Sequence, residues 1–432
     1  MTQVTIITVG SRGDVQPYVA LGKGLKTTGY RVRIIATDDF ENLVTEAGLE
    51  YVSSGANVQN ILQGEAWKDR IEGGNFIAIQ MQMRQELTKL APAISSRVIA
   101  GTEGSDVIIG GMGAMAGGFS IAEKLNIPII NAHVFPTTPS RQISSPIMPN
   151  LPFGDLLNRP AMMLSRQILW HSTRTFDVHV RESLDLPKAS FWGHFKQADQ
   201  HNIPTVYGYS RHVLPKPTDW TDHHHVVGYW FLDMDEDWQP PHDLLDFLDA
   251  GEPPIYIGFG SMRSNDAEQA GQMALEALEK AGQRGVLAAG WGGMTQNDLP
   301  DNVYMLASIP HSWLFPRMKA VVHHGGAGTT AAGLRAGVPT IITPFFADQP
   351  FWGKLVYELG VGAKPMPRKQ LTSAALGDAI RQVATDSSIQ QKATELGQNI
   401  RGEDSITPVS QLIEDMMTRA RVPEHHPVER TS

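Results

Sequence analysis

The stretch from His323 to Gln349 holds the residue types that could bind a charged ligand. It opens on two histidines and a run of small residues: His323, His324, Gly325, Gly326, Ala327, Gly328, Thr329 and Thr330. The apolar run before the glycines predicts a strand, and the sequence after them predicts a helix. A helix N-terminus carries partial positive charge and unpaired N–H groups, which glycines leave open to an anion. We therefore predict a phosphate site, in which His324 adds a donor and Thr329 a hydroxyl. A tight turn that needs small residues for packing is the alternative interpretation.

An acid and an amide, Asp348 and Gln349, follow the next predicted strand. Ligands of open parallel sheets bind at the carboxyl edge of the strands, where this pair falls. A carboxylate and an amide can hold the vicinal hydroxyls of a sugar. The alternative is that Asp348 caps the helix that follows it. A phosphate site beside a hydroxyl site indicates a nucleotide sugar.

The elements that must position these residues alternate between strand-like and helix-like segments. Strand-like runs occur at residues 4–9, 31–37, 105–111 and 127–134, and again at 253–262, 285–293, 302–310, 319–326 and 338–346. Helical patterns cover Phe76–Val98 and Asp266–Ala281, among others. This alternation predicts an α/β protein with two doubly wound, Rossmann-like domains.

Between residue 136 and about residue 228 the alternation weakens. A proline-rich stretch predicts a loop, and a broadly apolar helix follows it. Its apolar positions are Leu157, Ala161, Leu164 and Ile168 on one stripe, together with Met162, Met163 and Trp170. Such a stripe favours either a large apolar ligand or plain core packing.

Composition excludes several classes of function. The chain has 432 residues and a formal net charge of -9, the opposite of a non-specific nucleic-acid binder. It has no cysteine, which excludes disulfides and thiolate metal sites and fits a reducing, cytoplasmic compartment. The first residues lack the pattern of a signal peptide, and we expect no membrane-spanning segment.

Four motifs resemble a known family. Residues 323–349 resemble the donor-binding signature of family 1 glycosyltransferases. The segments IGFGSM at 257–262, IPHSWLFPRM at 309–318 and GSRGDVQPYVALGKGL at 10–25 resemble its sterol glucosyltransferase branch. Residues 136–240 add little to the resemblance. The resemblance implies the GT-B fold, in which two Rossmann-like domains face each other across a cleft.

The resemblance also implies a domain plan. It assigns residues 1–220 to an acceptor-binding domain, 221–241 to a linker and 242–404 to a nucleotide-sugar-binding domain. Residues 405–421 are then a helix that crosses back to the first domain, and 422–432 a tail. We expect a monomer or weak dimer that binds no nucleic acid and makes at most transient contact with a membrane surface.

The donor contacts follow from the resemblance residue by residue. It implies diphosphate contacts from Ser261, His324, Gly326, Gly328 and Thr329. It implies sugar contacts from Asp348 and Gln349. Plant members stack a tryptophan on the base and bind the ribose with a glutamate, but Ser308 and Ala332 stand at those positions here. Trp291 and Ile309 are therefore the candidates for the base. UDP is expected from the sterol branch, with TDP as the alternative.

Asp14 is the candidate catalytic base. Many family members have a histidine where Asp14 stands in Gly13-Asp14-Val15-Gln16-Pro17, whereas the sterol and glycopeptide-antibiotic branches have aspartate. Inverting transfer needs a base for the acceptor hydroxyl, and an ordinary carboxylate is a weak one. The alternative is that Asp14 caps a helix that begins near Pro17.

The acceptor-side candidates are fewer. They are Arg12, which orients Asp14 or faces water, His133, which is otherwise packed, and Met112 in a glycine-rich helix start.

The sequence thus predicts a hexosyltransferase for a sterol, terpenoid, macrolide or polyphenol, with glucose as the expected hexose. No cofactor and no metal are expected, since the acidic segment Asp233–Asp237 and the histidines His223–His225 are interpreted as solvated or structural. An NAD-dependent oxidoreductase is the alternative enzyme class, although the chain lacks its glycine fingerprint. A non-catalytic binder of nucleotide sugars or lipids is the third interpretation.

Overall fold

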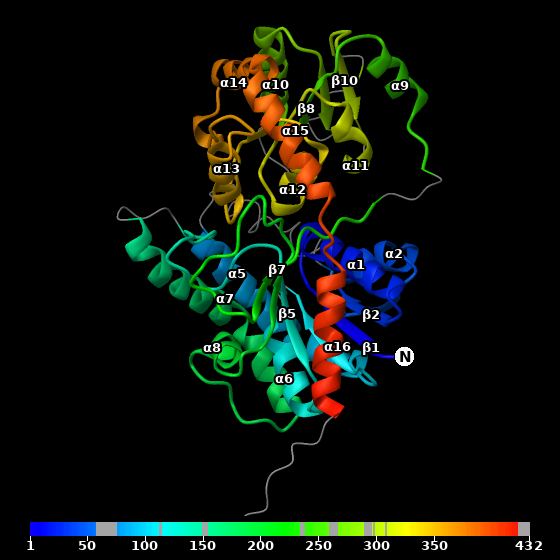
Figure 1. The fold of residues 1–432 in the computed structure, drawn as a ribbon, viewed down its shortest axis with the longest axis vertical. Coiled ribbons are helices and arrows are strands. Elements are labelled where there is room, and N and C mark those ends of the chain that lie inside the picture. The colour runs from blue at the N-terminus through cyan, green and yellow to red at the C-terminus, as the bar shows by residue number, and fades with distance from the viewer. Residues whose placement is uncertain are drawn as a thin grey trace, which may run out of the picture.

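The computed structural model describes residues 1–57, 76–111, 115–148, 154–233, 238–258, 267–288, 296, 299–306 and 309–421. These residues form two α/β domains, one above the other in Figure 1. The predicted site residues Met112, Ser261 and Trp291 lie outside these ranges, as does the predicted tail at 422–432.

The first domain is built on a parallel sheet. Its strand order is β3-β2-β1-β4-β5-β6-β7 in the described residues. The strands are β1 Gln3–Ile7, β2 Arg31–Ala36, β3 Glu50–Ser53, β4 Val107–Gly110, β5 Ile129–His133, β6 Thr205–Tyr207 and β7 His224–Val226. The β-branched residues of β1, β4 and β5 are buried, as expected for a sheet covered by helices on both faces. Ile7 pairs with Ile35 and Gly110, so these strands end at one edge.

The helices of this domain connect the strands. They are α1 Arg12–Thr27, α2 Glu41–Glu46, α5 Phe76–Gly101, α6 Met115–Leu125, α7 Asp155–Ser183 and α8 Gly193–Gln200, with a short 3-10 turn η1 at Asp38–Phe40. Helices α5 and α7 pack against each other on one flank of the domain (Figure 1).

The second domain repeats this architecture. Its parallel sheet has the order β10-β9-β8-β11-β12 in the described part of the chain. The strands are β8 Ile255–Gly258, β9 Gly285–Ala288, β10 Val303–Leu306, β11 Ala320–His323 and β12 Thr340–Ile342. The helices are α9 His242–Asp249, α10 Ala267–Ala281, α11 His311–Leu314, α12 Ala327–Ala336, α13 Gln349–Glu358, α14 Ser373–Thr385 and α15 Ser387–Arg401, with 3-10 turns η3 Phe315–Arg317 and η4 Arg368–Gln370. His323 pairs with Gly258 and Ile342, so β8, β11 and β12 end at a common edge.

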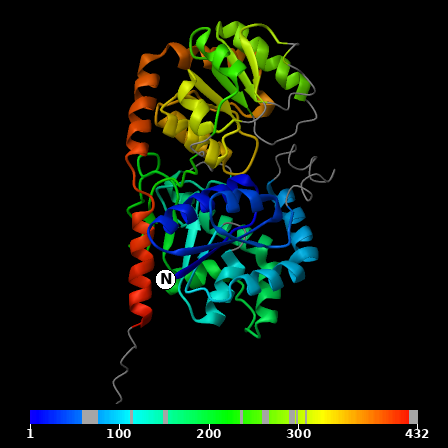
Figure 2. The ribbon, with the colours of Figure 1, turned by 90° about the vertical axis from the view of Figure 1, so that its right-hand side faces the viewer.

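The last helix, α16 Thr407–Arg421, lies along the first domain (Figure 2). Val409 and Ile413 are buried in the core of that domain, and the Tyr30 hydroxyl donates to the Ser410 carbonyl at 3.1 Å. A further apolar cluster joins the two domains, with Tyr209 and Tyr229 from the first and Leu334 and Trp352 from the second. The two domains are therefore packed against each other through apolar side chains.

The predicted domain boundary needs one correction. Strand β7 falls inside the range 221–241 assigned to the linker, yet it pairs in parallel with β6 and completes the first sheet. The first domain thus extends to at least Val226. The strand has three residues, two of them histidines, which is too short and too polar for an apolar pattern to reveal.

Candidate active site

The predicted phosphate site is a strand–loop–helix turn. β11 ends at His323, Gly325 turns the chain with φ +91°, and α12 begins at Ala327 with Gly326 as its N-cap. The Thr330 N–H donates to the Gly326 carbonyl at 2.9 Å, which is the first bond of the helix. The N–H groups of residues 327–329 precede that bond and have no acceptor within the helix. They are available to bind an anion, and we refer to this first turn of α12 as the anion cradle, the candidate phosphate site.

The three glycines of this turn have different reasons to be glycine. At Gly325 a Cβ would lie 2.5 Å from Ile342 Cγ2, and at Gly326 it would lie 2.7 Å from His324 Nε2. At Gly328 a Cβ would meet nothing within 4 Å, and φ there is not left-handed. Packing therefore accounts for Gly325 and Gly326 but not for Gly328. The missing side chain at Gly328 leaves room above the anion cradle.

The two histidines also separate in role. His323 is buried, and its Nδ1 accepts from the Gly325 N–H at 2.9 Å, so it holds the turn together. His324 is half-buried, and its Nδ1 has no partner in the part of the chain that the structure describes. Burial lowers the pKa of His324 to about 4, so its ring is neutral at pH 7. A neutral imidazole donates one hydrogen bond, which suits a phosphate oxygen.

Asp348 lies after β12, at the carboxyl edge. It occupies the N-cap position of α13 but makes no side-chain capping bond, and Asp348 Oδ2 instead accepts from Trp352 Nε1 at 2.8 Å. The preceding residue, Ala347, has φ +55°, a strained conformation for a side-chain-bearing residue. Burial raises the pKa of Asp348 to about 6, and the Asp14 carboxylate adds to the rise. The helix-cap alternative therefore does not account for this side chain.

Gln349 shapes the same loop. Its side chain is buried, and its Oε1 accepts from the Phe345 N–H at 2.7 Å and the Phe346 N–H at 3.2 Å. These bonds hold the loop that carries Asp348 at the sheet edge.

Asp14 lies in the first turn of α1, which begins at Arg12 rather than near Pro17 as predicted. Asp14 Oδ2 accepts from the Ser11 N–H at 2.8 Å and from Ser11 Oγ at 2.9 Å, which forms a capping box. Both bonds end on Oδ2, so the capping box does not use Oδ1. Burial raises the pKa of Asp14, and the two Ser11 bonds oppose that rise. The carboxyl group thus caps the helix and still keeps one oxygen for a ligand.

The site forms where the two domains meet. Helix α1 packs against α12, and Ala327 contacts the core of the first domain. Burial raises the pKa of Asp348 in the second domain, and the Asp14 carboxylate of the first raises it further, so the two carboxyl groups are close enough to interact electrostatically. Burial, then Arg12 and His324, lower the pKa of His311 to about 4, which links Arg12 to the donor side. Helices α1 and α12, whose first turns hold Asp14 and the anion cradle, therefore meet at the domain boundary.

His311, which the sequence analysis did not select, lies near enough to His324 for the two rings to interact electrostatically. Its ring stacks on Phe315 with centroids 4.2 Å apart and an angle of 16°. It directly follows Pro310 inside IPHSWLFPRM, so the motif itself was the available signal. Ile309, a predicted base contact, is half-buried against the neighbouring apolar cluster of the second domain.

Two of the acceptor-side candidates, His133 and Arg12, lie in the described part of the chain. His133 is buried, its ring stacks on Tyr207 at 5.8 Å, and burial lowers its pKa to about 3, with Arg166 adding to the effect. The packed alternative fits this enclosed ring, whereas a direct acceptor contact does not. Arg12 is exposed, and its Nε donates to Gln16 Oε1 at 2.8 Å, so the structure gives no bond by which it orients Asp14.

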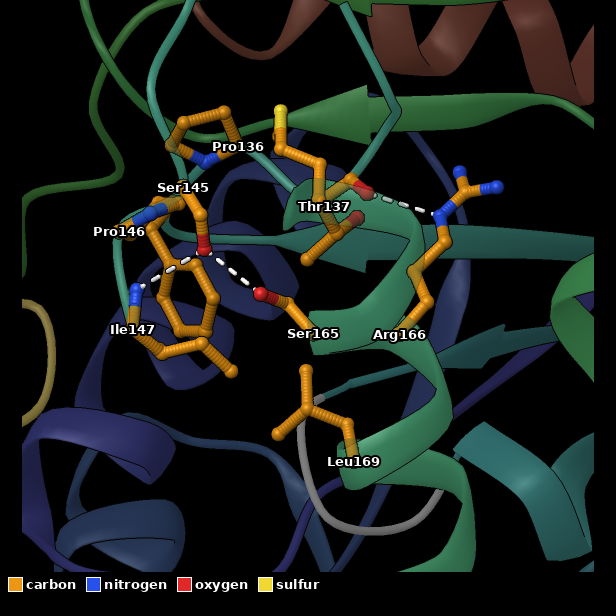
Figure 3. A pocket seen from close by; sticks show the side chains of 10 residues that line it. Pro136, Thr137, Ser145, Pro146, Ile147, Ser165, Arg166 and Leu169 are labelled. Carbon is orange, nitrogen blue, oxygen red and sulfur yellow. Dashed lines mark hydrogen bonds between the residues drawn. The ribbon is translucent and has the colours of Figure 1, made fainter. Parts of the chain in front are cut away.

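A small pocket lies between α7 and the loop after β5 (Figure 3). Ser145 and Ser165 share a hydrogen bond of 2.6 Å at one side, and Arg166 Nε donates to the Thr137 carbonyl at 2.8 Å at the other. Its cavity volume of about 10 Å³ is about that of one water molecule. The apolar side chains Met162 and Leu169 complete its lining.

The predicted apolar stripe of α7 faces two ways. Met162 and Trp170 are buried, whereas Met163 and Leu164 are exposed. Ala161 is buried as well, so the core interpretation holds for Ala161, Met162 and Trp170 but not for Met163 and Leu164.

The segments that we interpreted as solvated or structural make ordinary contacts. Asp233 pairs with Arg335 at 2.5 Å, while residues 234–237 lie outside the described ranges. His224 Nδ1 lies 3.0 Å from Thr221 Oγ1 within β7 and its turn. Within the described ranges, no group of three or more His, Asp or Glu side chains could hold a metal ion. No helix in those ranges combines the length and apolarity needed to cross a membrane.

Two family models match the chain. The glycosyltransferase family 28 N-terminal domain matches residues 4–143, and the C-terminal domain of erythromycin biosynthesis protein CIII-like proteins matches residues 288–416. A sterol 3-beta-glucosyltransferase of Arabidopsis thaliana is 38% identical over 94% of this chain, which spans 64% of that protein. One of Cryptococcus neoformans is 34% identical, and the chain spans 26% of it. The chain therefore corresponds to a part of these longer relatives.

Solved structures show the same fold at low identity. A kitacinnamycin glycotransferase has a TM-score of 0.69 at 19% identity and covers 96% of this chain. A calicheamicin glycosyltransferase has a TM-score of 0.65 at 17% identity and covers 98%. The fold is that of the GT-B class.

Within that class, the chain is similar to the sterol 3-beta-glucosyltransferases over 94% of its length.

Proposed function

We propose that this chain transfers a hexose, expected to be glucose, from a nucleoside-diphosphate sugar to a hydroxyl group of a sterol-like acceptor. The observation that carries the proposal is the packing of α1, whose first turn holds Asp14, against α12, whose first turn is the anion cradle, at the domain boundary. An anion site in one domain and a candidate base in the other are the two parts that glycosyl transfer from a diphosphate requires.

In this mechanism the donor diphosphate lies on the anion cradle. His324 donates to a phosphate oxygen, and the space above Gly328 lets the diphosphate approach the N–H groups of residues 327–329. When the bond between the anomeric carbon and the diphosphate oxygen breaks, its electron pair stays on that oxygen. The N–H groups and the helix dipole stabilise the new charge without a metal.

The acceptor hydroxyl attacks the anomeric carbon from the opposite side, which inverts the configuration. Its proton passes to Asp14, whose Oδ1 is outside the capping box. Burial raises the pKa of Asp14, so the group is a stronger base than an ordinary carboxylate. Asp348 and Gln349 hold the sugar hydroxyls in this scheme.

The choice of substrates rests on the relatives. The curated relatives are named sterol 3-beta-glucosyltransferases, which favours glucose and a sterol. UDP is proposed as the nucleotide from the sterol branch. TDP stays the alternative, because a structural neighbour, the glycosyltransferase VinC, is in complex with DTDP.

The test is a screen of sterols and other flat polycyclic alcohols with UDP-glucose and TDP-glucose, in the presence of excess chelator and with products read by mass. We expect an acceptor mass gain of one hexose, with turnover nearly the same when magnesium replaces the chelator. Loss of most activity with chelator, restored by magnesium or manganese, contradicts the metal-independent mechanism. A nicotinamide fluorescence titration that shows tight binding supports the oxidoreductase alternative instead.

A further inference from the structure

Helix α7 carries large apolar side chains on its outer side as well as its inner side. Leu156, Met163 and Leu164 are exposed by 79%, 52% and 51%. They are seven and eight residues apart, so they lie on one face of the helix. The opposite face holds the buried Met162 and Ser165. An exposed face of this kind at the start of a long helix marks an interaction site.

An aromatic pair extends this face. Phe191 and Trp192 are exposed by 60% and 48%, and their rings contact edge to face at 5.3 Å. Gln167 Nε2 donates to the Trp192 carbonyl at 3.3 Å, and the Phe191 ring lies 5.0 Å from that of His171. Gln167 and His171 follow Leu164 along the same side of α7. We define the outer apolar surface as Leu156, Met163, Leu164, Phe191 and Trp192.

The sequence around this surface is cationic. From Asp155 to Arg174 there are three arginines and one aspartate, and from Lys188 to Lys196 there are two lysines and no Asp or Glu. The whole chain, by contrast, has a net charge of -9. Arg166 pairs inward with Asp199 at 2.7 Å, but Lys188 and Lys196 are exposed on either side of the aromatic pair. Arg84 of α5 is exposed. Burial lowers the pKa of His171, and the positive charges of Arg174 and Arg84 lower it further.

We propose that the outer apolar surface docks on a lipid bilayer that carries anionic headgroups. Aromatic and aliphatic side chains that lie beside lysines fit the boundary between headgroups and acyl chains. Lysines near an anionic leaflet add attraction that salt screens. The charge of the surface, opposite to that of the chain, favours an anionic bilayer over a second copy of this acidic protein.

The outer apolar surface lies close to a pocket of the first domain, so docking on lipid would bring that pocket near the membrane. The inner face of α7 lines the pocket of Figure 3 through Ser165, Arg166 and Leu169. Docking would therefore place that pocket about one helix diameter, roughly 10 Å, from the lipid. Figure 1 shows α7 and α5 on the flank of the first domain, away from α16. An acceptor that dissolves in lipid would be presented beside the domain that receives it.

The experiment is cosedimentation of the purified chain with vesicles. One set is phosphatidylcholine, and the other contains about one third phosphatidylglycerol. The surface variant combines L156Q, F191S and W192S, whose side chains are exposed, and the charge variant combines K188E and K196E. The matched control combines Leu125→Gln and Tyr357→Gln, which are exposed by 44% and 49% on α6 and α13. Circular dichroism and melting temperature check that each variant is folded.

The parent and control proteins should bind anionic vesicles alike, and the surface variant should bind at least tenfold more weakly. The charge variant should lose the preference for anionic vesicles, as the parent should in high salt. The proposal is overturned if the parent binds neither vesicle, or if the control loses as much binding as the surface variant. It is also overturned if the surface variant changes only the oligomeric state in solution, which would mark a protein interface.

A second measurement separates this inference from the proposed function. Transfer to an acceptor dissolved in detergent micelles should be equal in parent and surface variant, whereas transfer to the same acceptor in anionic vesicles should fall at least tenfold in the variant. If neither protein transfers in micelles, the proposed function fails, while vesicle binding still decides the docking. Equal transfer by both proteins from vesicles overturns the docking alone.

Discussion

A buried carboxylate is costly at the scale of one residue, and Asp348 is the clearest example. Its pKa of about 6 exceeds the ordinary value of 3.8, so the folded state binds the proton more tightly than the unfolded state. Stability from this group is therefore present below pH 3.8 and is lost as the pH rises through 6. The difference corresponds to about 3 kcal/mol at neutral pH.

Asp348→Asn should remove this penalty, because asparagine keeps an oxygen for Trp352 Nε1 but does not ionise. We expect the variant to be more stable than the parent at pH 7.5, by up to about 3 kcal/mol, and equal to it near pH 4. Urea unfolding at both pH values measures this. A variant that is less stable at pH 7.5 would show that the carboxylate serves the fold rather than a ligand.

The diphosphate contact and the sugar contact of the donor site should be distinguishable by comparing the binding of UDP with that of UDP-glucose. His324→Ala should weaken binding of free UDP, roughly tenfold for one lost charge-assisted hydrogen bond. Asp348→Ala should leave UDP binding unchanged and weaken binding of intact UDP-glucose, since only the sugar contacts it. Calorimetry with both ligands measures this, and equal effects of both variants on both ligands would refute the assignment.

Residue types alone did not decide between the roles of these side chains. The sequence left Asp14 and Asp348 each as a ligand-binding group or a helix cap, because both roles use an acid at a helix start. The structure shows a capping box at Asp14 and none at Asp348. It also shows that the His133 ring is enclosed. The ring stacks on Tyr207, which pairs with His133 across β5 and β6 but lies 74 residues later in the sequence.

At the scale of elements, the anion cradle provides a test that separates function from fold. Gly328→Ala adds a methyl group where nothing lies within 4 Å, so the helix should gain about 0.5–1 kcal/mol of stability. The same methyl group should obstruct the diphosphate and weaken UDP binding at least tenfold. Melting temperature and calorimetry together measure this.

Gly333→Ala is the matched control in the same helix. Its Cβ would lie 2.9 Å from Thr340 Oγ1, so this variant should lose stability through overpacking. A Gly328→Ala variant that binds UDP normally would show that Gly328 is not part of a phosphate site.

Most elements were predictable where apolar residues formed long runs. β2, β4, β5 and the strands of the second sheet fall within the predicted ranges, and β1 begins one residue before its predicted range. Three strands, β3, β6 and β7, were not predicted, because they have three or four residues and little apolar pattern. The start of α1 was placed too late, because proline usually opens a helix, whereas Pro17 lies inside this one.

At the scale of the whole molecule, periodicity predicted two domains but not how they meet. The cluster that joins them combines Tyr209 and Tyr229 with Leu334 and Trp352, which are far apart in the chain. The crossing of α16 was expected only from the family resemblance, since its own pattern shows an amphipathic helix but not its partner. The shared electrostatics of Asp14 and Asp348 arise only when both domains are in place.

The central claim is that a base from the first domain acts on a donor held by the second. Asp14→Asn tests it most directly, because asparagine keeps an oxygen for Ser11 but does not take a proton at neutral pH. We expect a stability loss of at most about 1 kcal/mol, normal UDP affinity, and a fall of about two to four orders of magnitude in transfer to an alcohol. Transfer to an acidic phenol, which is already ionised, should be partly retained. Transfer to the alcohol within about threefold of the parent rate would contradict the account and leave Asp14 as a helix cap alone.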